Sequence, residues 1–148
     1  MKYTTTLKRL NDNNACSRGY DLIANHVGQG FSGDIDLLTI LEVNGLSDCI
    51  WALRATDGGK ELAVAFAIYC AEPYYTEPAW VKWASGWMAC VDRSANAAAN
   101  ADANAANAAN ADAYAAANAA YAAANADAYA ADKKRQVAIM RKLLGGEA

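Results

Sequence analysis

The chain of 148 residues is 55% hydrophobic and 20% charged, and its formal net charge is -3. This length suffices for one domain with a buried core. The N-terminal sequence MKYTTTLKRL lacks the apolar core of a signal peptide, and the Asn and Asp residues of an alanine-rich tract exclude a membrane span. We therefore expect a soluble cytoplasmic protein, located in the host cytoplasm if a phage encodes it.

We expect one all-α domain in three parts. Residues 1–11 are polar and would form an extended or frayed arm, and no segment shows the alternation of a strand. Over 12–92 apolar residues recur at helical spacing between Gly, Pro, Ser or Asp boundaries, which predicts a compact bundle of four to five short helices. A single long alanine-rich helix would follow over 93–144.

The first predicted helix is capped by Asp12 or Asn13, runs to about His26 and ends at Gly28. A second spans 34–43. Their inward positions would be Cys16, Tyr20, Ile23 and Val27 in the first helix and Ile35, Leu38 and Leu41 in the second.

A third helix would be capped by Ser47 and run through Ala55. Trp51 and Arg54 are off its core side and three residues apart, so we expect them to be neighbours on the helix surface. The core side would hold Leu46, Cys49, Ile50 and Leu53.

Residues 60–71 are apolar on nearly every side, which predicts a central helix. Pro73 breaks it, and Pro78 begins a fifth helix. Trp80, Trp83, Trp87 and Val91 share one face there, which favours core over a ligand box for the three tryptophans.

The four cysteines show no CxxC pair, and each falls on an apolar helical position. Buried, reduced thiols are the prediction, since free cysteine behaves as a small hydrophobic residue. No spacing supports a zinc site, and we expect neither metal nor cofactor. The residues concerned are Cys16, Cys49, Cys70 and Cys90.

The alanine-rich tract over 95–131 carries Asn and Tyr in steps of three and four, which places them in one stripe along a helix. The stripe predicts a homo-oligomer in which polar side chains pair with their copies. Alternatively, it packs on the chain's own Trp-bearing helix or contacts a partner. The interface residues would be Asn100, Asn104, Asn107, Tyr114, Asn118, Tyr121 and Asn125.

Catalysis is not expected. His26 is the single histidine, and neither a Ser, His and Asp set nor an HExxH motif occurs. The cations over 133–142 suit the negative end of a helix macrodipole better than a nucleic-acid patch. A binding surface has more support, because aromatic rings and cations occur close together. The candidates are Trp51, Arg54, Tyr74, Tyr75, Lys82 and Arg93.

The segments LKRLNDNNACSRG, SDCIWALRA, KELAVAFAIYCAEP and AWVKWASGW, followed by the alanine tract, occur in an order that resembles a phage and bacterial family of immunity proteins. Members of that family carry a long Ala/Tyr/Asp-rich tail. The resemblance implies an accessory protein of phage–host conflict and supplies no catalytic motif.

Three functions follow as hypotheses. The first is an anti-defence protein that sequesters a small anionic, nucleotide-like immune signal. The second is an immunity or anti-defence protein that blocks a toxin or effector protein by direct binding. The third is a structural helical oligomer.

Overall fold

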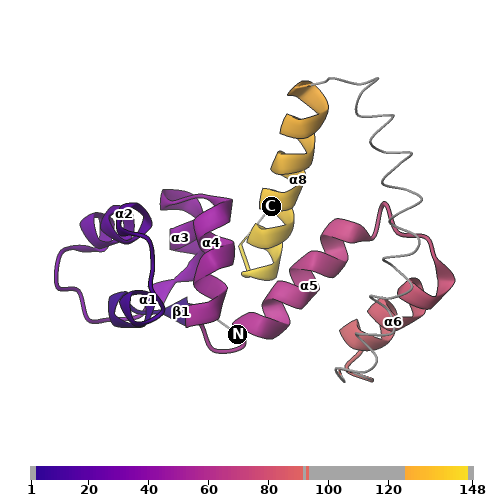
Figure 1. Cartoon of the computed structure of the whole chain (residues 1–148), viewed down its shortest axis with the longest axis horizontal. Helices are drawn as coiled ribbons and strands as arrows, with labels where there is room; N and C mark the ends of the chain where they lie inside the picture. The colour runs from indigo at the N-terminus through magenta and orange to yellow at the C-terminus, as the bar shows by residue number, and fades with distance from the viewer. Residues whose placement is uncertain (1–2, 92, 94–125, 147–148) are drawn as a thin grey trace. The chain divides into compact units, whose positions relative to one another are not determined.

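Short helices account for most of the ordered backbone in the computed structural model, which describes residues 3–91, 93 and 126–146 (Figure 1). The predicted all-α class is confirmed, with one two-stranded sheet added in the described residues. The chain divides into two compact units. The first unit comprises Met1–Phe66 and Lys134–Ala148, and the second unit comprises Ala67–Lys133.

The first unit contains most of the short elements. In chain order they are β1 (Thr4–Thr5), α1 (Leu7–Asp12), α2 (Ser17–Val27), β2 (Ile35–Asp36), α3 (Leu37–Val43), α4 (Leu46–Ala52) and the 3₁₀-helix η1 (Leu53–Ala55). Helix α5 (Gly59–Ala71) passes from the first unit into the second, which also holds α6 (Pro78–Met88). Helix α8 (Ala126–Leu143) passes back into the first unit.

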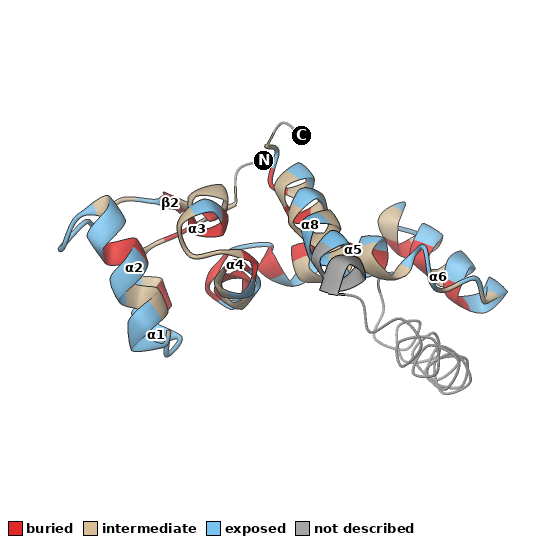
Figure 2. Ribbon diagram, turned by 90° about the horizontal axis from the view of Figure 1, so that it is seen from above, coloured by how far each residue is buried: buried red, intermediate tan, exposed pale blue. Residues whose placement is uncertain are grey.

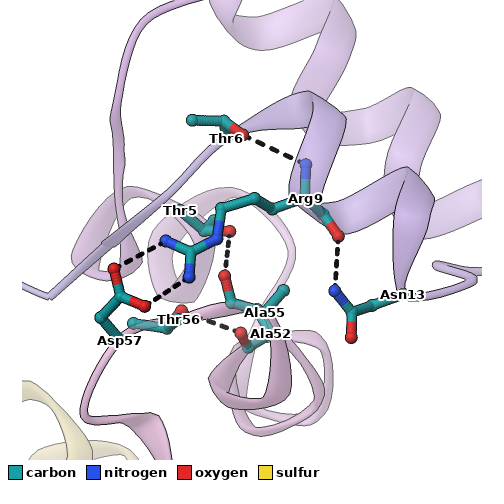
Figure 3. Close-up of polar contacts among 8 residues, drawn as sticks. All are labelled: Thr5, Thr6, Arg9, Asn13, Ala52, Ala55, Thr56 and Asp57. Carbon is teal, nitrogen blue, oxygen red and sulfur yellow. Dashed lines mark hydrogen bonds and ion pairs between the residues drawn. The ribbon is translucent and has the colours of Figure 1, made fainter.

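The predicted extended or frayed arm over 1–11 is wrong from residue 7 onward, where α1 forms, whereas residues 4–5 are extended as strand β1. Strand β1 pairs antiparallel with β2, with Thr5 opposite Ile35. Thr5 is fully buried, and its Oγ1 donates a hydrogen bond to the Ala55 carbonyl over 2.7 Å (Figure 3). Thr6 then caps α1 by accepting from the Arg9 N–H, and Leu7 and Leu10 enter the core.

An ion pair attaches α1 to the turn before α5. The Arg9 guanidinium donates to both carboxylate oxygens of Asp57, and its Nη1 lies 3.0 Å from Oδ2 (Figure 3). This two-bond geometry is the strong form of the pair. It lowers the pKa of Asp57, mainly through the hydrogen bond.

Three helices end in the same motif, in which a residue of left-handed conformation turns the chain back on the last helical turn. After α1 that residue is Asn14, with φ 61°, and Ala15 N–H donates to the Leu10 carbonyl over 3.0 Å. After α6 it is Cys90, with φ 59°, and after α8 it is Gly145, with φ 82°. These bonds satisfy carbonyls that a helix end leaves without partners.

The core of the first unit is built mainly by α1 to α5 and is completed by the end of the chain. Met140 is fully buried and Leu144 is 6% exposed within the same cluster as Leu7, Ile23 and Leu37. Figure 2 marks buried residues in red. Arg141 adds an ion pair to Glu42 of α3 over 2.8 Å.

This packing covers the apolar end of α8 within its own chain. Because Met140 is fully buried, this end of the helix needs no partner chain to cover it. The predicted continuous helix over 93–144 lies largely outside the described residues, as does the predicted interface of Asn100, Asn104, Asn107, Tyr114, Asn118, Tyr121 and Asn125.

Several predicted helix boundaries are corrected. Helix α3 begins at Leu37 and not at 34, because Ile35 belongs to β2 and Asp36 provides the cap by accepting from Leu38 N–H. Helix α4 begins at Leu46 after Gly45, so Ser47 is inside the helix and does not cap it. Ile50 is 39% exposed and does not belong to the core.

The cysteine prediction holds for Cys49, which is fully buried. It is wrong for Cys16, which caps α2, and for Cys90, which follows α6, since both are exposed. Cys70 is half-buried. None of these four described cysteines forms a disulfide.

In the second unit, Glu77 caps α6 by accepting from Trp80 N–H. Trp80 and Trp87 are buried as expected, and Trp83 is half-buried. Val91 is 79% exposed, because the left-handed turn at Cys90 ends the helix before Val91 can share the tryptophan face. In the described part of the chain, no helix combines the length and the apolar character that a membrane crossing requires.

Candidate functional site

Helices α2 and α4 approach closely at Gly19. A Cβ atom at this position would lie 2.7 Å from Oδ2 of Asp48 and 3.2 Å from Sγ of Cys16. Cys16 caps α2, since its Sγ accepts from Gly19 N–H over 3.4 Å. Glycine at position 19 therefore lets the Asp48 carboxylate lie directly against the backbone of α2.

Asn44, at the end of α3, connects the two helices. Its Nδ2 donates to the Gly19 carbonyl over 2.7 Å and to Oδ2 of Asp48 over 2.9 Å. Two acceptors on one side define the orientation of this amide. Its Oδ1 is buried without a hydrogen-bond partner in the described structure, and such a group is costly unless a ligand or water donates to it.

A pocket of about 270 Å³ opens beside this bridge in the first unit. Leu10, Ile23 and Ile40 form part of its apolar wall, and Tyr20 and Trp51 contribute aromatic rings. Mostly apolar walls with a few convergent polar groups are typical of small-molecule sites.

Polar groups of the pocket come from Asn44, Ser47 and Asp48, together with the Tyr20 hydroxyl and the Cys16 thiol. Among the described lining residues, Asp48 is the one with a charged side chain. Its Oδ2 accepts from Asn44, and no donor to its Oδ1 is found in the described residues. The Asp48 carboxylate therefore presents an acceptor to the pocket, and beside it a group that donates hydrogen bonds is favoured over an anion.

Trp51 and Arg54 are neighbours as predicted. The Arg54 guanidinium carbon lies 5.2 Å from the centroid of the Trp51 ring, within cation–π range. Trp51 is half-buried and lines the pocket, whereas Arg54 is exposed and outside the lining. A cation thus borders an aromatic wall without entering the cavity.

The other predicted binding residues belong to the second unit, so the structure does not show the six candidates as one site. The Arg93 guanidinium carbon lies 4.2 Å from the Trp87 ring centroid, and Arg93 Nε donates to the Trp87 carbonyl over 3.1 Å. The Tyr75 ring centroid lies 5.4 Å from that of Trp80.

Tyr74 and Lys82 are exposed. The Tyr74 hydroxyl donates to Asp132 over 3.2 Å. A second hollow of about 240 Å³ has Ile68, Tyr75 and Trp80 among its lining residues.

Sequence reasoning missed Gly19, Tyr20, Asn44 and Asp48 as site residues. In the sequence, Asn44 simply follows the predicted helix over 34–43. Its bond to the Gly19 carbonyl spans 25 positions in the chain, and no local spacing signals such a contact.

The described side chains show which groups could hold a metal ion and where the single histidine lies. Within those residues, no group of three or more His, Cys, Asp or Glu could hold a metal ion. His26 is exposed in the last turn of α2 and does not line the pocket.

Comparison with known proteins adds no family assignment. No family model matches the chain, and neither a search of curated proteins nor one of solved structures found a match.

Proposed function

We propose that the chain is a non-enzymatic binding protein of phage–host conflict that sequesters a small nucleotide-like signal in the Trp51 pocket. One observation carries the proposal: Trp51 lines a cavity while the Arg54 cation lies 5.2 Å from its ring centroid. An aromatic wall supports a stacked base, and a cation outside the cavity supports an attached phosphate.

The charge of the pocket refines the expected ligand. An anionic group inside the cavity would meet the Asp48 carboxylate and be repelled. The base would therefore enter and the phosphate would stay outside, near Arg54. Sequestration needs no chemical step.

The experiment uses the full chain purified under native conditions. After denaturation, released small molecules are identified by mass spectrometry, and calorimetric titration with the four ribonucleoside monophosphates measures affinity. Trp51→Ala should lower affinity by about tenfold, because a stacked base contributes roughly 1–3 kcal/mol. Ile50→Ala is the matched control, since Ile50 is exposed on the same helix and outside the pocket lining. Absence of nucleotide binding, or equal affinity in both variants, contradicts the proposal.

A second candidate is direct blocking of a toxin or effector protein. Its support is three exposed side chains of the second unit: Tyr74, Val81 and Val91 are 61%, 44% and 79% exposed. Exposed apolar side chains contribute to protein interaction sites. If this candidate is right, Val81→Asp should abolish the protection of cells against the toxin or effector protein, whereas Trp51→Ala should leave that protection intact. The reverse pattern supports sequestration.

A further inference from the structure

We propose that the Trp51 pocket selects a guanine-type base by its hydrogen-bond donor edge, with Asp48 as the residue that reads it. The inference rests on the proposed function and names the ligand class of the same site. It is carried by the Asn44–Asp48 bridge and by the size of the cavity.

Asp48 is held in place for this role. Asn44 Nδ2 fixes its Oδ2 over 2.9 Å, and the backbone at Gly19 lies directly beside that oxygen. Oδ1 of Asp48 has no donor within the described residues, and Oδ2 keeps a second lone pair. A carboxylate with this freedom can accept two neighbouring N–H groups at once.

Guanine offers such a pair, because its N1–H and its 2-amino group are adjacent on one edge. Adenine instead places an acceptor nitrogen beside its amino group, and that nitrogen would face the carboxylate. The Asp48 carboxylate penalises the wrong edge, because two acceptors would face each other and the carboxylate would be left without a donor.

The cavity is large enough for a purine base. Pockets for drug-sized ligands usually measure about 300–1,000 Å³, and this one measures about 270 Å³. We place a planar ring system between the apolar wall and Trp51. The sugar and any phosphate would then remain outside the cavity, beside Trp51, where the Arg54 guanidinium contacts the Trp51 ring.

The test is calorimetric titration of the full chain with guanosine, inosine, adenosine and guanosine monophosphate. Guanosine should bind more tightly than adenosine by roughly tenfold, and inosine, which lacks the 2-amino group, should fall between them. Guanosine monophosphate should equal or exceed guanosine, and Arg54→Ala should remove any excess.

The variant Asp48→Asn distinguishes recognition of the base by Asp48 from a purely structural role of this residue. Asn44 would hold the remaining oxygen, so the new amide nitrogen would take the place of Oδ1 and would seek an acceptor. Guanosine affinity should fall, and affinity for xanthosine, which carries a carbonyl in place of the 2-amino group, should rise. A switch of preference is not produced by a variant that has only lost stability.

The outcomes separate the two proposals. If Trp51-dependent binding occurs with equal affinity for guanosine and adenosine, the guanine inference is overturned and sequestration stands. If guanosine is preferred but Asp48→Asn leaves the preference unchanged, Asp48 is not the reader and the inference also fails. If no nucleoside or nucleotide binds, both proposals fail.

Discussion

Asn44 donates from Nδ2 to Oδ2 of Asp48 over 2.9 Å, and the same nitrogen donates to the Gly19 carbonyl over 2.7 Å. One amide therefore connects α2 with the start of α4 at the wall of the pocket. The site and the packing of the first unit depend on the same side chain.

Asn44→Ala should lower the free energy of unfolding by about 1–3 kcal/mol, because the Gly19 carbonyl and Asp48 lose a shared donor. Chemical denaturation measures this change. Asn25→Ala is the control, since the Asn25 hydrogen bond to Gln29 is exposed and local, and its effect should stay within about 0.5 kcal/mol. Equal effects of the two variants would contradict a structural role for the bridge.

Cys90→Gly should stabilise the chain. Cys90 has φ 59° at the end of α6, a conformation that costs an ordinary residue roughly 1 kcal/mol and glycine very little. The melting temperature should therefore rise, measured under reducing conditions. Gly145→Ala is the reciprocal control, because Gly145 occupies the same position after α8 with φ 82°, and it should lower the melting temperature. A fall of the melting temperature in both variants would refute this explanation of how α6 ends.

Acid should weaken the first unit through Asp57. Arg9 holds the pKa of Asp57 below its ordinary value of 3.8, first through the side-chain hydrogen bond and then through charge. Since the folded pKa is depressed, the ion pair stabilises the fold above 3.8 and the contribution is lost as pH falls through the folded pKa. Asp57→Asn should remove that part of the pH dependence in urea unfolding. An unchanged acid slope would show that the pair contributes nothing measurable.

The cysteines should differ in reactivity. Burial raises the pKa of the Cys49 thiol to about 12, so the thiolate that reacts with alkylating reagents is scarce at neutral pH. Cys16 and Cys90 are exposed and should be labelled first in the native protein, as peptide mass spectrometry can show. The pKa of this thiol in the unfolded chain is 9.0. The free energy of unfolding should therefore decline as pH rises above 9.0, because the unfolded chain then loses the thiol proton more readily than the fold does. Early labelling of Cys49 would contradict its place in the core.

Helical periodicity was enough to predict the all-α class, because long apolar segments carried the 3–4 spacing between clear boundaries. It missed α1, in which only Leu7 and Leu10 are buried. The stop after α1 was missed for a related reason: Asn14 takes the left-handed position that glycine usually marks. At the end of α6, Cys90 takes this left-handed position in place of glycine. The helix end was therefore missed there as well, and Val91 was wrongly predicted to share the tryptophan face.

The candidate site was predicted in part. Trp51 and Arg54 are three residues apart on one helix turn, so their contact follows from local geometry. Gly19, Asn44 and Asp48 meet through tertiary packing of separate helices. Gly, Asn and Asp are also common at helix ends as capping residues, so their presence in the sequence does not indicate a site. Spacing alone therefore could not identify the pocket.

The most direct test of the central claim is a titration of the full, ¹⁵N-labelled chain with guanosine monophosphate, followed at the indole N–H signals of its four tryptophans. Trp51→Phe assigns the signal of Trp51. If guanosine monophosphate binds in the Trp51 pocket, the Trp51 signal shifts and reaches a plateau as ligand is added, while the signals of Trp80, Trp83 and Trp87 do not shift. No shift at Trp51, or shifts confined to the three tryptophans of α6, would contradict ligand binding in the Trp51 pocket.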